Sequence, residues 1–477
     1  MYKLDYIGKA QFLLAIDEPI KIAKLDSSFD LDGRYIAELV RQKVISRYGL
    51  SAYAEGLSVF TTIQSSLQKV AIESLQKNLF DYDKRHGWRK PINYSDQLSP
   101  QIFYQLGLGN LDVLLEESRE LDALGMKQSY ISILREIFQQ LINLDSHAKA
   151  IVIDVKPERI IYLDDDFSLQ TLIWSNNYQW ARRRITINSF GPKPQNFYDV
   201  LNIGDLIYLK NNELSRILDQ LPEAEAAFIA SNPSTGAILS YQGGFNFSKS
   251  NFDRVKQSFP QAGSSFKPFI YSAAFANGYG ASDTINDAPI IFEDKNLESS
   301  WRPENYTGKF YGLIRLREAL VQSVNIVSIK LLRELGIDQA HTFLESFGFD
   351  KSRLAPDLSL ALGSSSFSPA EMIRAYNFLA NEGKGKDLYF IEKIVDRNNN
   401  ILFQQPHPQK ILDVSKSLDG FPWFSKELIK EIQLFTLLPP LNKQKKSIDS
   451  KIAFITKDIL REALQRGSNG RKTKVLN

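Results

Sequence analysis

A serine and a lysine stand three residues apart in the segment QAGSSFKPFIYSAAFANG, at 261–278. Side chains three apart on a helix share one face. Pro268 is tolerated only in a first helical turn, so the pattern predicts that Ser264 lies at or beside the N-cap. A hydroxyl there lies in a positive potential that favours a developing anion, and Lys267 could be its base if burial lowers the lysine's pKa. The spacing is therefore compatible with an acyl-accepting serine.

The Ser-x-x-Lys pattern alone is weak, because it occurs four times in the chain. The four pairs are Ser66/Lys69, Ser74/Lys77, Ser146/Lys149 and Ser264/Lys267. The first two fall within an expected amphipathic helix and the third at an expected domain junction. Ser264 could also be an ordinary N-cap with Lys267 facing solvent, and this stretch alone favours that interpretation.

A second polar pair interrupts the apolar stretch LREALVQSVNIVSIKLLRELG at 316–336. Serine and asparagine are poor choices inside an apolar helix unless they end it locally or face a polar cleft. Ser323 could cap a helix that begins at Val324. Ser323 and Asn325 could instead present a hydroxyl and an amide to a cleft shared with Ser264, and the two interpretations are compatible.

The elements that would position these residues follow from hydrophobic periodicity and turn signals. Around the two motifs we expect four helices, at 264–277, 314–335, 338–347 and 369–382. The turn NPSTG at 232–236 predicts a hairpin. Short strands and loop are expected over 384–450, followed by a last helix at 455–465.

The N-terminal half combines helices with a small β-module. In the first fifty residues a helix is expected with Gly49 as its C-cap and one apolar face, formed by Ile36, Val40, Val44 and Ile45. Next we expect a strand at 57–64, a helix at 65–80, a loop at 81–100 and a long helix at 110–144. Residues 148–215 alternate in short runs, which predicts about five strands and favours an oligonucleotide/oligosaccharide-binding (OB) type of barrel.

Composition excludes several classes of chemistry. The chain has 477 residues, no cysteine and four histidines. Disulfides, thiol catalysis and cysteine-ligated zinc are excluded, and the scattered histidines disfavour a metal site or a Ser-His-Asp triad. A net charge of +3 does not indicate nucleic-acid binding. No apolar run is long enough to span a membrane, and no metal or cofactor is expected.

Longer stretches of the sequence resemble class A penicillin-binding proteins, of the penicillin-binding protein 1A type. The stretches are FDRVKQSFPQAGSSFKPFIYSAAFANG, SSWRPENY, IRLREALVQSVNIVSIKLL and LSLALGSSSFSPAEMIRAYNFLANEG, in this order. The Ser-x-x-Lys and Ser-x-Asn pairs match the first two motifs of penicillin-recognising enzymes. GLSVFTTIQSSLQKVAIESLQKNLFDYDKRHGWRKP resembles the segment before the transpeptidase domain, and 148–215 resembles an OB-like insertion. The resemblance covers nearly the whole chain.

The resemblance implies an α+β fold divided into four parts. Residues 1–50 would be the tail of a glycosyltransferase domain with a linker, and 51–147 a pedestal before the transpeptidase. Residues 148–220 would form the OB-like β domain. Residues 221–477 would form the penicillin-binding transpeptidase domain.

The same resemblance implies roles for individual residues. Ser264 would be the nucleophile, Lys267 its general base and Ser323 the relay that delivers a proton to the departing D-Ala. Asn325 would hydrogen-bond the substrate's peptide amide and Lys267, and Trp301 and Asn305 would also bind substrate. The implied reaction transfers the acyl group of a D-Ala-D-Ala stem peptide to Ser264 and then to an amine of a neighbouring stem peptide. β-Lactams would trap Ser264.

The sequence departs from the family at its third motif. Lys-Thr/Ser-Gly is absent, because RKTK at 471–474 has Lys474 where the glycine is needed. The absent strand would supply an oxyanion-hole N–H, typically worth about 10²–10³ in rate. The glycosyltransferase active-site motif and a membrane anchor are not found either. We therefore expect a chain truncated at both ends that neither polymerises glycan nor crosslinks efficiently as given.

The family also implies partners and a location. Stem peptides and β-lactams are the expected ligands, with cell-wall elongation or division proteins and outer-membrane lipoprotein regulators as protein partners. The expected location is the periplasmic face of the bacterial inner membrane. Two alternatives stay open: a D,D-carboxypeptidase or β-lactamase-like hydrolase that uses water as acceptor, and a catalytically impaired fragment that only binds partners.

Overall fold

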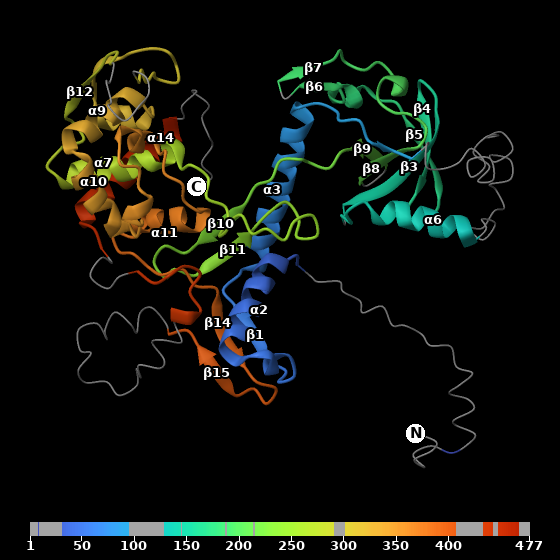
Figure 1. The fold of residues 1–477 in the computed structure, drawn as a ribbon, viewed down its shortest axis with the longest axis horizontal. Coiled ribbons are helices and arrows are strands. Elements are labelled where there is room, and N and C mark those ends of the chain that lie inside the picture. The colour runs from blue at the N-terminus through green and yellow to red at the C-terminus, as the bar shows by residue number, and fades with distance from the viewer. Residues whose placement is uncertain are drawn as a thin grey trace. The chain divides into compact units, whose positions relative to one another are not determined.

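The structure is a computed structural model (Figure 1). Besides Gly8, it describes residues 31–94, 128–144, 146–186, 188–212, 215–290, 301–406, 433–441 and 447–466. Helices and antiparallel ladders are mixed along the chain, which confirms the α+β expectation. Across the described residues, no helix combines the length and apolar character needed to cross a membrane.

The first described elements match the expected helix and strand. Helix α2 (Arg34–Tyr48) ends at Gly49, whose N–H donates to Ile45 O as a C-cap. Strand β1 (Ser58–Thr61) pairs with β14 (Ile391–Val395), which pairs in turn with β15 (Ile401–Gln404). Figure 1 shows the blue β1 beside the orange β14, so distant parts of the sequence form one small sheet.

Helix α3 (Ser65–Arg85) is longer than the expected 65–80. Its buried face continues at helical spacing through Leu79 to Asp83, whose carboxylate pairs with Arg89. The expected loop at 81–100 is therefore partly wrong, because it also contains β2 (Ile92–Asn93), a strand that joins the sheet of the β-module. Residues 95–100 lie outside the described part of the chain.

The β-module is a six-stranded antiparallel sheet. Its strands besides β2 are β3 (His147–Val155), β4 (Arg159–Asp164), β5 (Leu169–Ile173), β8 (Asp205–Asn211) and β9 (Arg216–Asp219). The order is β2-β8-β3-β4-β5, with β9 paired to β8. Two short strands, β6 (Arg184–Thr186) and β7 (Ser189–Phe190), pair separately.

Both faces of strand β3 are buried, which explains its unbroken apolar run. Ile151 and Ile153 pack with side chains of helix α6 (Gln128–Gln139), whereas Ala150 and Val152 point into a second cluster on the other face. Successive strand side chains point to opposite faces, so a strand covered on both sides shows no polar alternation. Of the long helix expected at 110–144, residues 128–139 are helical, 140–144 are not, and 110–127 lie outside the described residues.

The C-terminal half combines a hairpin with several helices. The expected hairpin is confirmed as β10 (Phe228–Ser231) and β11 (Ile238–Gln242), which are joined through NPSTG. The other elements are α7 (Lys267–Ala276), β12 (Thr284–Asp287), β13 (Gly312–Arg315), α8 (Leu316–Val321), α9 (Asn325–Leu335), α10 (Ile337–Leu344), α11 (Pro369–Ala380) and α14 (Ser450–Arg466). Strands β12 and β13 form an antiparallel pair.

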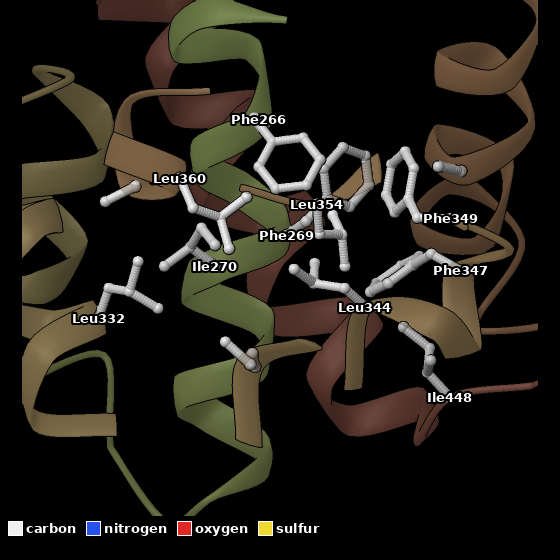
Figure 2. Close-up of a cluster of buried hydrophobic side chains, with 14 of the residues drawn as sticks. Phe266, Phe269, Ile270, Leu332, Leu344, Phe347, Phe349, Leu354, Leu360 and Ile448 are labelled. Atoms are coloured by element: carbon white, nitrogen blue, oxygen red, sulfur yellow. The ribbon is translucent and has the colours of Figure 1, made fainter. Parts of the chain in front are cut away.

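Helix α7 runs through the largest apolar cluster that the described residues form. Phe266, just before the helix, and Phe269 and Ile270 within it are fully buried. They meet side chains of neighbouring segments (Figure 2), among them Leu332, Leu344, Phe347, Phe349, Leu354 and Leu360. Burial of this kind stabilises a fold by about 1.5–3 kcal/mol for each large side chain. The helix that begins at Lys267, directly after the turn of Ser264, is therefore rigidly supported.

Candidate active site

Ser264 lies in a 3-10 turn, Gly263–Phe266, that leads directly into α7. The sequence predicted one helix from 264, and the structure tightens its first turn while keeping Pro268 at the permitted N-terminal position. Gly263 has φ +58, a conformation that glycine adopts without strain. Ser264 is exposed.

Contacts from a distant segment hold this turn in place. The N–H groups of Ala262 and Gly263 donate to Ser365 O (3.0 Å) and Gly363 O (2.9 Å). The hydroxyl of Tyr376 on α11 donates to Ser265 O at 2.6 Å. Burial raises the pKa of Tyr376 to about 12, so this hydroxyl stays protonated and remains a donor. The position of Ser264 is thus fixed from two sides.

Lys267 is buried, with 1% of its surface exposed. Its Nζ donates to Ser323 O (2.7 Å), Ser323 Oγ (3.1 Å) and Asn325 Oδ1 (2.7 Å). Within the described ranges these acceptors are all uncharged, and no carboxylate offsets the cost of burying the ammonium. Burial therefore lowers the pKa of Lys267 from 10.5 to about 8.

The three acceptors around Lys267 are not chemically alike. A backbone carbonyl and an amide oxygen can only accept, whereas the Ser323 hydroxyl can also donate. A neutral lysine amine has two N–H donors and one lone pair. It can keep its bonds to Ser323 O and Asn325 Oδ1 while its lone pair accepts from Ser323 Oγ. The cluster is therefore able to pass a proton between Lys267 and Ser323.

Ser323 occupies a break between two helices. Its φ is +55, and Val324 N donates back to Ala319 O at 2.8 Å, which ends α8. Left-handed backbone costs a non-glycine residue about 1–2 kcal/mol. This turn lets both the carbonyl and the hydroxyl of Ser323 reach Lys267. The apolar stretch expected as one helix at 314–335 is therefore split into α8 and α9, and α9 begins at Asn325.

The amide of Asn325 is held in one orientation. Its Nδ2 donates to Glu304 O at 2.9 Å, which leaves Oδ1 to accept from Lys267. The sequence pairs Ser-x-x-Lys and Ser-x-Asn, separated by more than fifty residues, thus meet in one cluster through Lys267. Among the described groups, the Ser264 hydroxyl has no hydrogen-bond partner, and it stands one helical turn before Lys267.

The two other predicted site residues, Asn305 and Trp301, have different surroundings. Asn305 is buried, and its amide bonds backbone groups of Asn325 and Ile326 and the carboxylate of Asp287. Trp301 is half-buried against the apolar cluster around α7. Substrate binding by Trp301 and Asn305 stays a prediction.

Sequence reasoning overlooked three supporting residues, Gly363, Tyr376 and Asp287. Gly363 follows an apolar run and precedes three serines, a pattern that indicates a turn, and this was the only sign of its role in the sequence. Tyr376 and Asp287 had none, because a tyrosine in an amphipathic helix and an aspartate at a strand end are ordinary surface choices. Their roles emerge only from which backbone groups they contact.

The rate at which Ser264 is acylated should depend on pH through Lys267. Only a neutral amine can accept a proton, and a pKa of about 8 leaves about one chain in ten with neutral Lys267 at pH 7, against about one in three thousand for a pKa of 10.5. The second-order rate of labelling by a fluorescent penicillin should rise about tenfold per pH unit from 6 to 7 and level off above 8. A rate that stays flat or falls over this range would contradict Lys267 as the base.

Comparisons with known proteins show which family the sequence matches. Residues 226–476 match the family model described as the penicillin-binding protein transpeptidase domain, and 119–224 match the penicillin-binding protein OB-like domain. The chain is 37% identical over 421 residues to penicillin-binding protein 1A of Pseudomonas aeruginosa, covering 88% of this chain and 47% of that protein. It is 33% identical over 399 residues to penicillin-binding protein 1A of Escherichia coli, covering 84% and 44%.

A solved structure shows a similar fold. The crystal structure of penicillin-binding protein 1A from Haemophilus influenzae aligns with a TM-score of 0.73 and 28% identity, covering 98% of this chain and 62% of that one. The chain spans about half the length of the curated relatives that it matches.

Proposed function

The chain belongs to the penicillin-binding proteins, and from this premise we propose that it is the D,D-transpeptidase module of a bifunctional cell-wall synthase. The supporting observation is the buried Lys267, whose amine bonds both Ser323 and Asn325 one turn after an exposed Ser264. A lysine with its pKa lowered by burial is suited to accept a proton near neutral pH. The substrate would be the D-Ala-D-Ala end of a peptidoglycan stem peptide.

The proposed reaction has two steps. Ser264 Oγ attacks the carbonyl carbon of the penultimate D-Ala, and its proton moves to Lys267. The bond to the terminal D-Ala breaks, and the departing amine receives a proton through Ser323. An amine of a neighbouring stem peptide then attacks the acyl-enzyme, forms the crosslink and returns a proton to Ser264. Asn325 holds Lys267 and would also hold the substrate's peptide amide.

The remaining parts of the protein are assigned by the same premise. We assign 1–50 to the tail of a glycosyltransferase domain, 51–147 to a pedestal, 148–220 to the OB-like domain and 221–477 to the transpeptidase domain. A location at the periplasmic face of the inner membrane, glycan polymerisation by a longer protein and the protein partners named above belong to this proposal. β-Lactams would acylate Ser264 because they mimic D-Ala-D-Ala.

Covalent labelling of Ser264 tests the proposal. The 477-residue chain is incubated with benzylpenicillin for several hours at pH 8.5, and intact-protein and peptide mass spectrometry locate the adduct. We expect an adduct on the peptide containing Ser264, and none in Ser264→Ala. Ser265→Ala is the matched control, because Ser265 Oγ bonds its own turn through Ala262 O and should label normally. An adduct that persists in Ser264→Ala would overturn the assignment of the nucleophile.

The acceptor distinguishes transpeptidation from hydrolysis. A D-Ala-D-Ala peptide is supplied with and without a D-amino acid as acceptor, and the products are separated by chromatography. A transpeptidase forms the exchanged peptide in proportion to the acceptor concentration. A product that is only the shortened peptide at every acceptor concentration would favour the hydrolase instead.

A further inference from the structure

The N-terminus of α9 has no cap from its own residues. Val324 occupies the N-cap position, and its side chain cannot accept a hydrogen bond. The N–H groups of Asn325 and Ile326 donate instead to Asn305 Oδ1, at 3.0 and 3.2 Å. The first N–H groups of a helix need a partner from outside its own ladder. Asn305, twenty residues earlier, supplies that partner.

The other end of the Asn305 amide is held by a buried carboxylate. Its Nδ2 donates to Asp287 Oδ1 and Oδ2, at 3.0 and 2.9 Å, and to Lys309 O at 2.9 Å. Asp287, at the end of β12, is 1% exposed and also accepts from Tyr311 N at 2.8 Å. Both Asp287 oxygens accept in these contacts, so they orient Asn305 with Nδ2 inward and Oδ1 toward the helix.

This arrangement acts directly on the site. Asn325 donates its backbone N–H to Asn305 and accepts from Lys267 through its side chain, and Glu304 O holds the rest of that side chain. Two consecutive residues, Glu304 and Asn305, thus fix both the backbone and the amide of Asn325. Ser323, with its left-handed backbone, lies two residues before Asn325. The contacts that fix Asn325 therefore also limit the movement of the turn at Ser323.

We propose that Asp287 and Asn305 are positioning residues for the transpeptidase site, which set the start of α9 and so keep Ser323 Oγ and Asn325 Oδ1 against Lys267. We call the contacts from Asp287 through Asn305 to the first N–H groups of α9 the clamp. The clamp itself does not depend on the proposed function, but its effect on catalysis does. In this proposal neither residue touches the substrate. Because Asn305 accepts from the first N–H groups of α9, the N-cap position needs no polar side chain. It is occupied by Val324, which is buried.

A reciprocal exchange of the two side chains tests the clamp. Asn305→Asp places two carboxylates face to face, and Asp287→Asn makes an amide donor face another donor. The double variant Asp287→Asn/Asn305→Asp restores the contact between the two side chains and the one to the helix, because the carboxylate introduced at position 305 can accept from both the helix and the new amide. Only Lys309 O loses its donor. In both single variants the amides at the start of α9 should lose protection from hydrogen exchange, and the loss should be larger in Asn305→Asp than in Asp287→Asn. The double variant should recover most of this protection.

Two readouts are measured on the full chain. Hydrogen exchange of the peptide spanning 322–329 reports the amides of Asn325 and Ile326, and it should be about tenfold faster or more in the single variants, since unpaired amides exchange from open states. Acylation by benzylpenicillin should slow by about tenfold or more, with recovery in the double variant. Asp253→Asn is the matched control, since Asp253 is a buried carboxylate bonded to Tyr241 in the same domain.

The outcomes separate the clamp from the proposed function. Faster exchange that the double variant reverses supports the clamp even if no variant is acylated, in which case the proposed function alone fails. Exchange at 322–329 that is unchanged in both single variants would overturn the clamp. If the acylation rate falls in every variant in proportion to its loss of thermal stability, and also falls in Asp253→Asn, then Asp287 and Asn305 only stabilise the fold and do not position the site.

Discussion

Replacing Lys267 with methionine should slow the acylation of Ser264 by about a thousandfold. A positioned general base contributes roughly 10²–10⁴ in rate, and the described cluster offers Ser264 no second amine or imidazole. Methionine keeps the length and the apolar stem, so the walls of the buried site can close around it. The measurement is the second-order rate constant for labelling by a fluorescent penicillin at pH 8.5.

Stability distinguishes this loss from unfolding. The lowered pKa of Lys267 means that its burial disfavours the folded state by about 3 kcal/mol below pH 8, a cost that fades as pH rises from 8 to 10.5. Methionine removes this cost but leaves the acceptors on Ser323 and Asn325 unpaired, at about 1–3 kcal/mol each. The two effects oppose each other, so the melting temperature should fall by less than the loss of these three hydrogen bonds alone would cause. A Lys267→Met chain that melts normally and labels at the original rate would refute the assigned base.

The local parts of this site could be predicted from sequence. Pro268 limits where a helix can begin, which placed Ser264 at its start, and the apolar run behind it suggested a buried lysine. Ser323 and Asn325 were identified because polar residues inside an apolar stretch need a reason. The same reasoning allowed for the break between α8 and α9. These are effects of neighbouring residues, which periodicity and propensity report.

The parts that hold the site could not be predicted in this way. Asn305 was expected to bind substrate, which stays a prediction. The sequence did not predict that, within the described part of the chain, its side chain bonds protein groups from β12, the turn at Lys309 and α9. Tyr376 reaches Ser265 across 111 residues of sequence. Such contacts depend on the tertiary fold, and a single sequence carries no pattern for them. The family resemblance located the motifs but said nothing about what supports them.

Gly363 is the supporting residue whose change should have the largest effect. A Cβ added at Gly363 would lie 2.0 Å from Gly263 O and 2.6 Å from Gly263 N and C. These are backbone atoms, so no side-chain rotation can relieve the overlap. Gly363 also has φ +75, which disfavours any other residue. At these two glycines the backbones of the 363–366 segment and of the turn of Ser264 are therefore in direct contact.

Gly363→Ala should slow acylation of Ser264 by about a hundredfold or more, because a displacement near 1 Å at a reacting group costs about that much. It should also lower the free energy of unfolding by about 2–4 kcal/mol, from the overlap and the left-handed backbone together. Labelling is measured well below the melting temperature, which is determined for each variant. The hydrogen bond from Gly263 N to Gly363 O would be lost as the turn moves.

The matched control is Gly278→Ala, which separates the overlap from backbone strain. Gly278 has φ +96 but no atom within 4 Å of an added Cβ, so alanine there meets only the left-handed penalty. It should lose about 1 kcal/mol of stability and label at the original rate. If Gly363→Ala labels as fast as Gly278→Ala, the close glycine contact does not position Ser264. If only Gly363→Ala loses labelling, the 363–366 segment belongs to the machinery that presents the nucleophile, although it contributes no group to the chemistry.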